Sequence, residues 1–169
     1  MKIKIAILGS TGSIGKSLLK IILKNKNNYE INLLACNKNY LSLLKQAQKF
    51  NVKNLIITNK KKYKLARSKN KNSNIKIFND FTKLNKILDR KIDYVMSSIT
   101  GLDGLIPTIE IIKYTKKIAI ANKESIICGW NLIKKELNKN NTQFIPVDSE
   151  HFSIWYGLKN NKDTIQNIF

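Results

Sequence analysis

The segment that decides the fold is Lys4-Ile5-Ala6-Ile7-Leu8-Gly9-Ser10-Thr11-Gly12-Ser13-Ile14-Gly15. Its first five residues form a largely apolar run that predicts a buried β-strand. The glycines recur at every third position, at 9, 12 and 15, and predict a tight turn. From residue 13 to residue 23 the apolar side chains return at helical spacing, at positions 14, 18, 19, 22 and 23. The segment therefore predicts a strand, a glycine turn and a helix in direct succession.

A glycine turn between a strand and a helix is a typical binding site for a pyrophosphate. Gly9 permits the tight turn, Gly12 lets the backbone approach the phosphates, and Gly15 lets the helix pack closely on the strand. The free amides and the dipole at the start of the helix also favour an anion. The spacing G-x-x-G-x-x-G differs from G-x-G-x-x-G and is closer to that of NADP-type reductases. A plain glycine turn is the alternative, but a position at the first β-to-α turn favours dinucleotide binding.

The rest of the chain alternates strand and helix patterns. Strand patterns recur at 31–35, 55–57, 75–78, 94–97 and 118–121, and helical patterns at 41–50, 60–66, 81–88 and 105–114. Strands separated by helices of about ten residues predict βαβ units and a parallel sheet. We expect an α/β fold of the Rossmann-like, doubly wound type with a mainly parallel sheet. The alternation is lost over 144–169, so we expect one domain over 1–145 and the start of a second over 146–169.

The net charge of +20 raises the question of a nucleic-acid partner. Nearly all of the positive charge is lysine, and Arg67 and Arg90 are the two arginines. The lysines are dispersed and interleaved with asparagine, as at 24–28 and 69–72. Nucleic-acid surfaces usually favour arginine, whose planar fork matches phosphates and bases. The pattern is more typical of an AT-rich genome, and we expect no nucleic-acid partner.

Other sequence features indicate the class of protein. No apolar run approaches the roughly 18 residues of a membrane span. The strand pattern begins at once, which leaves no room for a signal or transit peptide. Cys36 and Cys128 lie far apart without a surrounding motif, which favours two reduced, buried thiols over a disulfide or a metal site. We therefore expect a soluble, cytoplasmic protein that has no membrane partner.

The residues that follow the second predicted strand indicate which dinucleotide binds. NAD sites usually carry an acidic residue there, which bonds to the ribose 2′-hydroxyl. This chain has Asn37-Lys38-Asn39, and Glu30 lies at the opposite end of the strand. A cation between two amides suits a 2′-phosphate, so we expect NADPH as the cofactor. The alternative is that Lys38 is one of many surface lysines.

Two further motifs follow predicted strands. Ala121-Asn122-Lys123-Glu124-Ser125 places a cation and hydrogen-bonding groups at the ligand edge of the sheet, or it is an ordinary helix start with Glu124 in the first turn. Pro146-Val147-Asp148-Ser149-Glu150-His151 contains two carboxylates at alternate positions. In an extended segment these would face one side and suit Mg²⁺ or Mn²⁺. Equally, Asp148 or Ser149 would cap a helix. We expect His151, the only histidine, to be structural or to support a ligand residue, rather than to be a ligand itself.

Taken together, GSTGSIG, ANKES and PVDSEH, in this order and spacing, resemble the signatures of the 1-deoxy-D-xylulose 5-phosphate reductoisomerase family. The resemblance runs from residue 4 to about residue 156 and includes 98–101 and 104–108. It implies an NADPH-dependent oxidoreductase of isoprenoid precursor synthesis by the non-mevalonate pathway. Such an enzyme isomerises and reduces 1-deoxy-D-xylulose 5-phosphate to 2-C-methyl-D-erythritol 4-phosphate with the help of Mg²⁺ or Mn²⁺.

The resemblance also implies roles for individual residues. The pyrophosphate would be held by Gly9, Thr11, Gly12, Ser13 and Ile14, and the 2′-phosphate by Asn37, Lys38 and Asn39. Asn122 and Glu124 match cofactor contacts, and Lys123, Ser149 and Glu150 match substrate contacts. Asp148 and Glu150 match two of the three metal carboxylates and, with Lys123, form the expected catalytic set. The family usually has glycine at the position of Asn37.

Members of this family are more than twice as long as this chain and form homodimers. The resemblance therefore implies that 146–169 begin an incomplete catalytic domain. The third metal carboxylate, the substrate phosphate pocket and the closing lid would lie outside the chain. Two carboxylates alone should hold a divalent ion poorly, so we expect the chain to be inactive by itself. A non-catalytic NADPH-binding module is the alternative.

Overall fold

Seven parallel strands form one sheet in the computed structural model, which describes residues 1–70, 74–147 and 149–160. The strands are β1 (Ile3–Leu8), β2 (Tyr29–Cys36), β3 (Asn54–Ile57), β4 (Lys76–Phe78), β5 (Ile92–Ser97), β6 (Thr115–Ile120) and β7 (Gln143–Pro146). The helices are α1 (Ser13–Lys24), α2 (Tyr40–Phe50), α3 (Lys60–Lys69), α4 (Leu84–Ile87), α5 (Leu105–Ile112), α6 (Lys123–Lys139) and α7 (Ser149–Asn160). Two short 3₁₀-helices, η1 (Lys26–Asn28) and η2 (Leu102–Gly104), complete the described elements.

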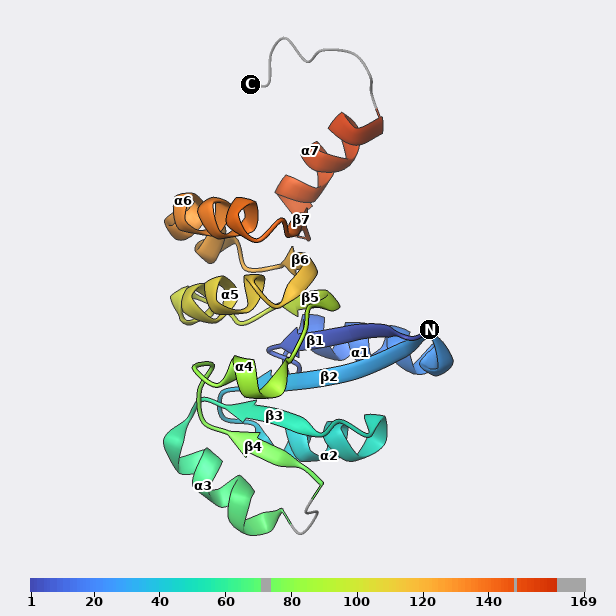
Figure 1. The fold of residues 1–169 in the computed structure, drawn as a ribbon, viewed down its shortest axis with the longest axis vertical. Coiled ribbons are helices and arrows are strands. Elements are labelled where there is room, and N and C mark those ends of the chain that lie inside the picture. The colour runs from blue at the N-terminus through green and yellow to red at the C-terminus, as the bar shows by residue number, and fades with distance from the viewer. Residues whose placement is uncertain (71–73, 148, 161–169) are drawn as a thin grey trace.

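The strand order is β4-β3-β2-β1-β5-β6-β7, with β4 near the bottom of Figure 1 and β7 near the top. The chain runs outward from β1 to β4, crosses back to β5 beside β1, and runs outward again to β7. This reversal confirms the doubly wound, Rossmann-like fold, and every strand pair described is parallel. In such a sheet, ligands bind at the carboxyl ends of the strands where the direction reverses, here between β1 and β5.

The sheet has an apolar core on each face. One core joins the sheet to the inner sides of α1, α2 and α3, and the other joins it to α4, α5 and α6. Strand β1 contributes to both, since Ile5 and Ile7 point to the first core and Ala6 and Leu8 to the second. A strand that is buried on both faces requires a nearly continuous apolar run. The run that opens the sequence therefore places β1 at the centre.

Asparagine side chains set the start of three helices. The Oδ1 atom of the residue before each helix accepts an amide hydrogen bond from the third helical residue; the pairs are Asn39 with Ser42, Asn59 with Lys62, and Asn122 with Ser125. Asparagine is among the preferred N-cap residues, because this bond satisfies an amide that the helix itself cannot. The asparagine-rich composition thus has a structural use at the carboxyl edge of the sheet.

The structure corrects two predicted elements. The helix predicted over 81–88 is limited to α4, because Asp80 accepts bonds from the Thr82 amide and hydroxyl and holds the preceding residues in a turn. The loss of alternation from residue 144 does not mark the end of the sheet, since β7 pairs with β6 up to Pro146. Beyond β7, α7 extends away from the sheet at the top of Figure 1. The domain boundary between 145 and 146 stays a prediction.

The two cysteines differ in environment. Cys36 is buried at the end of β2, and burial raises the pKa of its thiol to about 12. Cys128 is exposed on α6, so the prediction of two buried thiols is wrong for this residue. It lies outside the buried side of the helix, which is formed by Ser125, Ile126, Gly129, Ile133 and Leu137.

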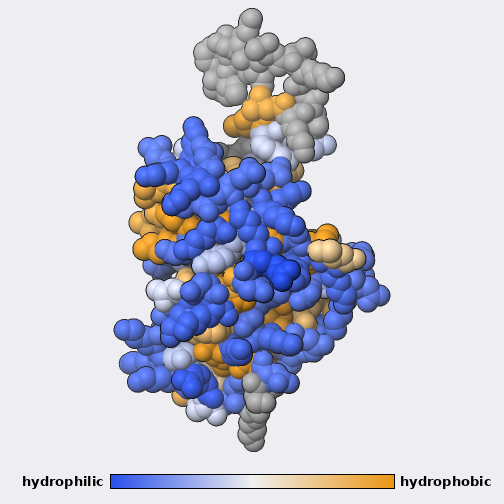
Figure 2. Space-filling view, in the orientation of Figure 1, coloured by the Kyte–Doolittle hydropathy of each residue, from blue (hydrophilic) through white to orange (hydrophobic). Residues whose placement is uncertain are grey.

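One face of the molecule is mainly hydrophilic. Figure 2 shows hydrophilic residues over most of the face that it views. In the part of the chain that the structure describes, no helix combines the length and the apolar character needed to cross a membrane.

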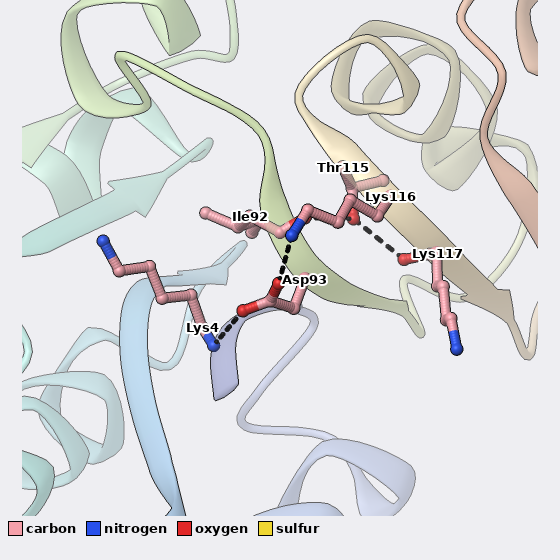
Figure 3. Close-up of polar contacts among 6 residues, drawn as sticks. All are labelled: Lys4, Ile92, Asp93, Thr115, Lys116 and Lys117. Atoms are coloured by element: carbon pink, nitrogen blue, oxygen red, sulfur yellow. Dashed lines mark hydrogen bonds and ion pairs between the residues drawn. The ribbon is translucent and has the colours of Figure 1, made fainter. Parts of the chain in front are cut away.

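At the amino ends of the central strands, one carboxylate joins three strands (Figure 3). Asp93 in β5 accepts a bond from the Lys4 amide of β1 at 2.9 Å and one from the Lys116 ammonium of β6 at 2.8 Å. The hydrogen bond from Lys116 is the larger cause, and that from Lys4 the next, of a pKa held below the ordinary value of 3.8. The carboxylate form of Asp93 is therefore favoured by the folded state.

We predict that Asp93→Asn lowers the free energy of unfolding at pH 7 by about 0.5–1 kcal/mol, because the ion pair is partly exposed. Since the folded pKa is depressed, the stabilisation is full above the unfolded pKa, near 4, and is lost as the pH falls through the folded pKa. Urea unfolding of both proteins between pH 7 and pH 2 measures this. A stability difference that stays constant over that range would contradict the assignment.

Candidate functional site

The glycine loop has the geometry of an anion site. Gly9 has φ +82°, and a Cβ atom there would lie 2.6 Å from the Ser98 carbonyl oxygen. A Cβ atom at Gly15 would lie 2.5 Å from the Ser10 Cα. Gly12 is exposed and precedes α1 in an extended conformation, and glycine has no side chain that could cap the helix. The first amides of α1 are therefore available to an external anion.

Ser10 anchors the loop from beneath and was not predicted. Its hydroxyl donates to Gln46 Oε1 of α2 at 2.8 Å, and Gln46 Nε2 donates to the Ser10 carbonyl at 3.0 Å. Ser10 is fully buried, whereas Thr11 is half-buried and Ser13 and Ile14 are exposed. The reciprocal pair fixes the glycine loop to α2. A polar residue beside Leu43 and Ala47 on the inner side of α2 was the available sequence signal for Gln46.

We predict that Gln46→Ala lowers the free energy of unfolding by about 1–2 kcal/mol, because the Ser10 carbonyl loses its side-chain donor and the buried Ser10 hydroxyl keeps only the long bond of 3.5 Å to the Ala35 carbonyl. Chemical denaturation measures the effect. Gln48→Ala, an exposed position on the same helix, is the matched control and should change stability by less than about 0.5 kcal/mol. Equal effects of the two substitutions would show that Ser10 does not depend on Gln46.

Backbone hydrogen bonds join the segments that follow the strands into one edge. The Gly9 amide donates to the Ala35 carbonyl at 3.0 Å, and the Ser98 amide donates to the Leu8 carbonyl at 2.9 Å. The Ala121 amide donates to the Ser97 carbonyl at 2.9 Å. These bonds place the glycine loop, the Asn37–Asn39 segment and the start of α6 along the same carboxyl edge. The sheet thus brings together motifs that lie more than 100 residues apart in sequence.

A hollow of about 490 Å³ opens at this edge beside the glycine loop. The ends of β2 and β3 and the segment after β5 line it, with Ala35, Cys36, Asn37, Thr58, Asn59, Lys60, Phe81, Ile99, Thr100, Asp103 and Pro107 as lining residues. Asn37 lines the hollow, and Lys38 and Asn39, which follow it directly in the chain, are exposed to solvent and therefore accessible to a ligand. A somewhat larger hollow, about 560 Å³, lies at the outer edge between α3 and β4 and is remote from the glycine loop.

Asn122 holds the segment after β5. Its Nδ2 donates to the Ile99 carbonyl and, at 2.7 Å, to the Gly101 carbonyl, while its Oδ1 accepts from the Ser125 amide at 3.0 Å. The side chain is 3% exposed, and both of its amide hydrogens are committed to this segment. The two alternatives for the ANKES motif are therefore compatible, because the helix cap also orders one wall of the hollow. The cofactor contact expected of Asn122 stays a prediction.

We predict that Asn122→Asp lowers the free energy of unfolding at pH 7 by at least about 2 kcal/mol. The oxygen that caps α6 is kept, but a carboxylate oxygen would face the Ile99 and Gly101 carbonyls. The defect should diminish near pH 5, where protonation restores a donor. Denaturation at both pH values measures it. Asn39→Asp, at the exposed cap of α2, is the control. An equal loss of stability in both proteins would contradict the role of Asn122 in holding the segment after β5.

Further predicted site residues follow Asn122 at the same edge. Lys123 and Glu124 are exposed in the first turn of α6. Pro146 pairs with Ile120 in the sheet register, so the PVDSEH segment begins next to the ANKES segment. Ser149 is exposed at the start of α7. Asp148 and the side chain of Glu150 lie outside what the structure describes. Within the described residues, no group of three or more His, Cys, Asp and Glu could hold a metal ion.

Comparison with known proteins identifies the family. A family model described as 1-deoxy-D-xylulose 5-phosphate reductoisomerase matches residues 5–129. The chain belongs to this family. The reductoisomerase of Pelagibacter ubique is 61% identical over 161 residues, which are 94% of this chain and 42% of that protein. The reductoisomerase of a Wolbachia pipientis strain from Culex pipiens is 37% identical over 166 residues, which are 98% of this chain and 42% of that protein.

Solved reductoisomerase structures share the fold. The enzyme of Zymomonas mobilis in complex with NADPH matches with a TM-score of 0.81 and 30% identity over 89% of this chain and 40% of that chain. A structure of DOX-P reductoisomerase with NADPH, fosmidomycin and magnesium matches with a TM-score of 0.80 and 32% identity over 88% and 37% of the two chains. This chain thus spans about two fifths of the reductoisomerases that it matches.

Proposed function

We propose that this chain is the NADPH-binding part of a reductoisomerase. The observation that carries the proposal is the uncapped start of α1 behind the Gly9–Gly12 turn, with Asn37-Lys38-Asn39 beside it on the same edge. The amides of α1 suit a pyrophosphate, and Lys38 with its flanking amides suits a 2′-phosphate. The similarity to a reductoisomerase in complex with NADPH supports the same assignment.

Each residue of this edge has a defined task in the proposal. Gly12 lets the pyrophosphate approach the backbone of Ser13 and Ile14, and Thr11 adds a hydroxyl. Gly9 keeps the turn close to Ser98, so that the cofactor would lie across the carboxyl ends of β1 and β5. Glu124 and Asn122 would contact the cofactor at the start of α6. NADPH, when bound, supplies a hydride.

For the full-length protein we propose the family reaction, the conversion of 1-deoxy-D-xylulose 5-phosphate to 2-C-methyl-D-erythritol 4-phosphate. Lys123 would provide positive charge for the sugar phosphate, with Ser149 and Glu150 as further contacts. Asp148 and Glu150 would bind Mg²⁺ or Mn²⁺, whose chemistry is the stabilisation of negative charge on substrate oxygens. A solved relative that contains magnesium and fosmidomycin supports these assignments.

The proposal separates cofactor binding from turnover. Because the chain spans 42% of its curated relatives, we expect it to lack reductoisomerase activity when assayed alone. We expect it still to bind NADPH, because the residues proposed for the cofactor lie within the chain. If the chain were instead a non-catalytic NADPH-binding module, it would also bind NADPH without turnover. The two cases differ because only the reductoisomerase has a catalytic half that the chain could complement. A cytoplasmic location and a homodimer of the full-length protein also belong to the proposal, and the family resemblance is what supports them.

The experiment is a calorimetric titration of the chain with NADPH and with NADH, together with the variant Gly12→Asp. We expect NADPH to bind at least about tenfold more tightly than NADH, because a charge-assisted contact to the 2′-phosphate contributes about 1.5–3 kcal/mol. Gly12→Asp should reduce NADPH affinity by at least about 100-fold. Its carboxylate would itself cap α1 and repel the pyrophosphate, so thermal stability should be retained.

Ser17→Asp is the matched control, since it adds the same charge at an exposed position one turn along α1. It should leave NADPH affinity within about threefold of the parent protein. If the folded parent chain bound neither dinucleotide, the cofactor assignment would be wrong. Retained affinity in Gly12→Asp would reject the glycine loop as the pyrophosphate site.

A further inference from the structure

We infer that Lys60 is a second cation for the 2′-phosphate of the cofactor and strengthens the preference for NADPH over NADH. The inference rests on the proposed function and deepens it. The family resemblance assigned this recognition to the Asn37–Asn39 segment alone. Lys60 comes from a different element, the start of α3, which lies 22 residues further along the chain than Lys38.

Two backbone hydrogen bonds fix the start of α3 against the end of β2. The Thr58 amide donates to the Cys36 carbonyl at 3.1 Å, and the Asn59 amide donates to the Asn37 carbonyl at 3.4 Å. These bonds continue the pairing of β2 with β3 beyond the last paired residues, Cys36 and Ile57. Lys60 therefore follows directly on a segment that is bonded to the residue before Lys38.

Lys60 also faces the same space as that segment. Asn37, Asn59 and Lys60 are among the residues that line the hollow of about 490 Å³, as are Ile99, Thr100 and the carboxylate residue Asp103. The hollow borders the carboxyl end of β2, where a dinucleotide site of this fold reads the ribose adjoining the adenine. An ammonium that lines this hollow can form an ion pair with a 2′-phosphate, whereas an unphosphorylated ribose offers it only a neutral hydroxyl oxygen.

The charge pattern of α3 supports a functional role. Lys60, Lys61 and Lys62 occupy its first turn, which contains no acidic residue. Cations at the start of a helix are unfavourable, because they face the positive end of the helix dipole as well as one another. Lys62 Nζ lies 6.0 Å from the centre of the Tyr40 ring, where the ring offers partial compensation. Of the three, Lys60 lines the hollow. A phosphate dianion bound there would offset the unfavourable interaction of its ammonium with the helix dipole and the neighbouring lysines.

The competing explanation is that Lys60 is one solvated lysine among the 31 lysines and arginines of the chain. In that case Lys60 and Lys61 would be equivalent, since both are exposed neighbours in the same turn. In our proposal they differ, because Lys61 does not line the hollow. The pair therefore provides a test in which overall charge, helix position and side-chain type are matched.

The test compares Lys60→Gln with Lys61→Gln in titrations with NADPH and NADH at low and moderate salt. We expect Lys60→Gln to weaken NADPH binding about tenfold and to change NADH binding by less than about twofold, as loss of one charge-assisted phosphate contact would. Lys61→Gln should leave both affinities near those of the parent chain. The salt dependence of NADPH affinity should decrease in Lys60→Gln alone.

Three outcomes would overturn the inference. Equal loss of NADPH and NADH affinity in Lys60→Gln would show a general effect on the site. Equal weakening of NADPH binding by the two substitutions would show that Lys60 acts only through the net charge of the chain. Unchanged NADPH affinity in Lys60→Gln, with a parent chain that binds NADPH, would reject this residue and leave the proposed function intact. A parent chain that does not bind NADPH would reject both.

Discussion

The close approach of Gly9 to the backbone of Ser98 is the constraint on which the site depends. A side chain at Gly9 would lie within 2.6 Å of the Ser98 carbonyl oxygen, and its φ of +82° is one that other residues rarely adopt. The contact lies where the sheet reverses direction between β1 and β5. If a side chain held the Gly9 turn and the Ser98 segment apart, the turn could not pack across the carboxyl ends of β1 and β5. The first amides of α1 would then point away from the crevice.

Around this contact, polar side chains hold the surrounding segments from below while the exposed side stays free. Ser10 and Gln46 join the glycine turn to α2, and Asn122 joins the segment after β5 to α6. Each of these anchors is buried or partly buried, and each satisfies backbone groups that would otherwise be costly to bury. The outer atoms of Gly12, Ser13 and Lys38 are exposed as a result. A rigid support with free donors is the arrangement that an anionic cofactor requires.

Much of the fold was readable from the sequence because its signals are local. Apolar runs of four or five residues predicted the central strands, and helical spacing predicted α1, α2 and α5. The errors occurred where a side chain or a pairing partner overrode the local pattern. Asp80 forms a turn that shortens α4, and β7 pairs with β6 through residues where the alternation of strand and helix patterns was already lost. Among the site residues, the sequence could place the exposed glycine turn and Lys38. It also placed Gln46 beside Leu43 and Ala47 on the inner side of α2, but it could not reveal Ser10 as its partner, because the two residues lie 36 positions apart and meet only in the folded sheet.

By itself, the sequence determined the fold class, the family and the loop that would bind the pyrophosphate, because these follow from the order of short apolar and glycine-rich segments. The tertiary structure decided which separate segments act together. It set Asn122 as both a helix cap and a clamp, and it placed the start of α3 against the end of β2, where Lys60 lies beside the segment that carries Lys38. The physical reason is that hydrogen bonds between neighbouring strands fix the relative positions of the loops that follow them, and strand order is a property of the folded sheet.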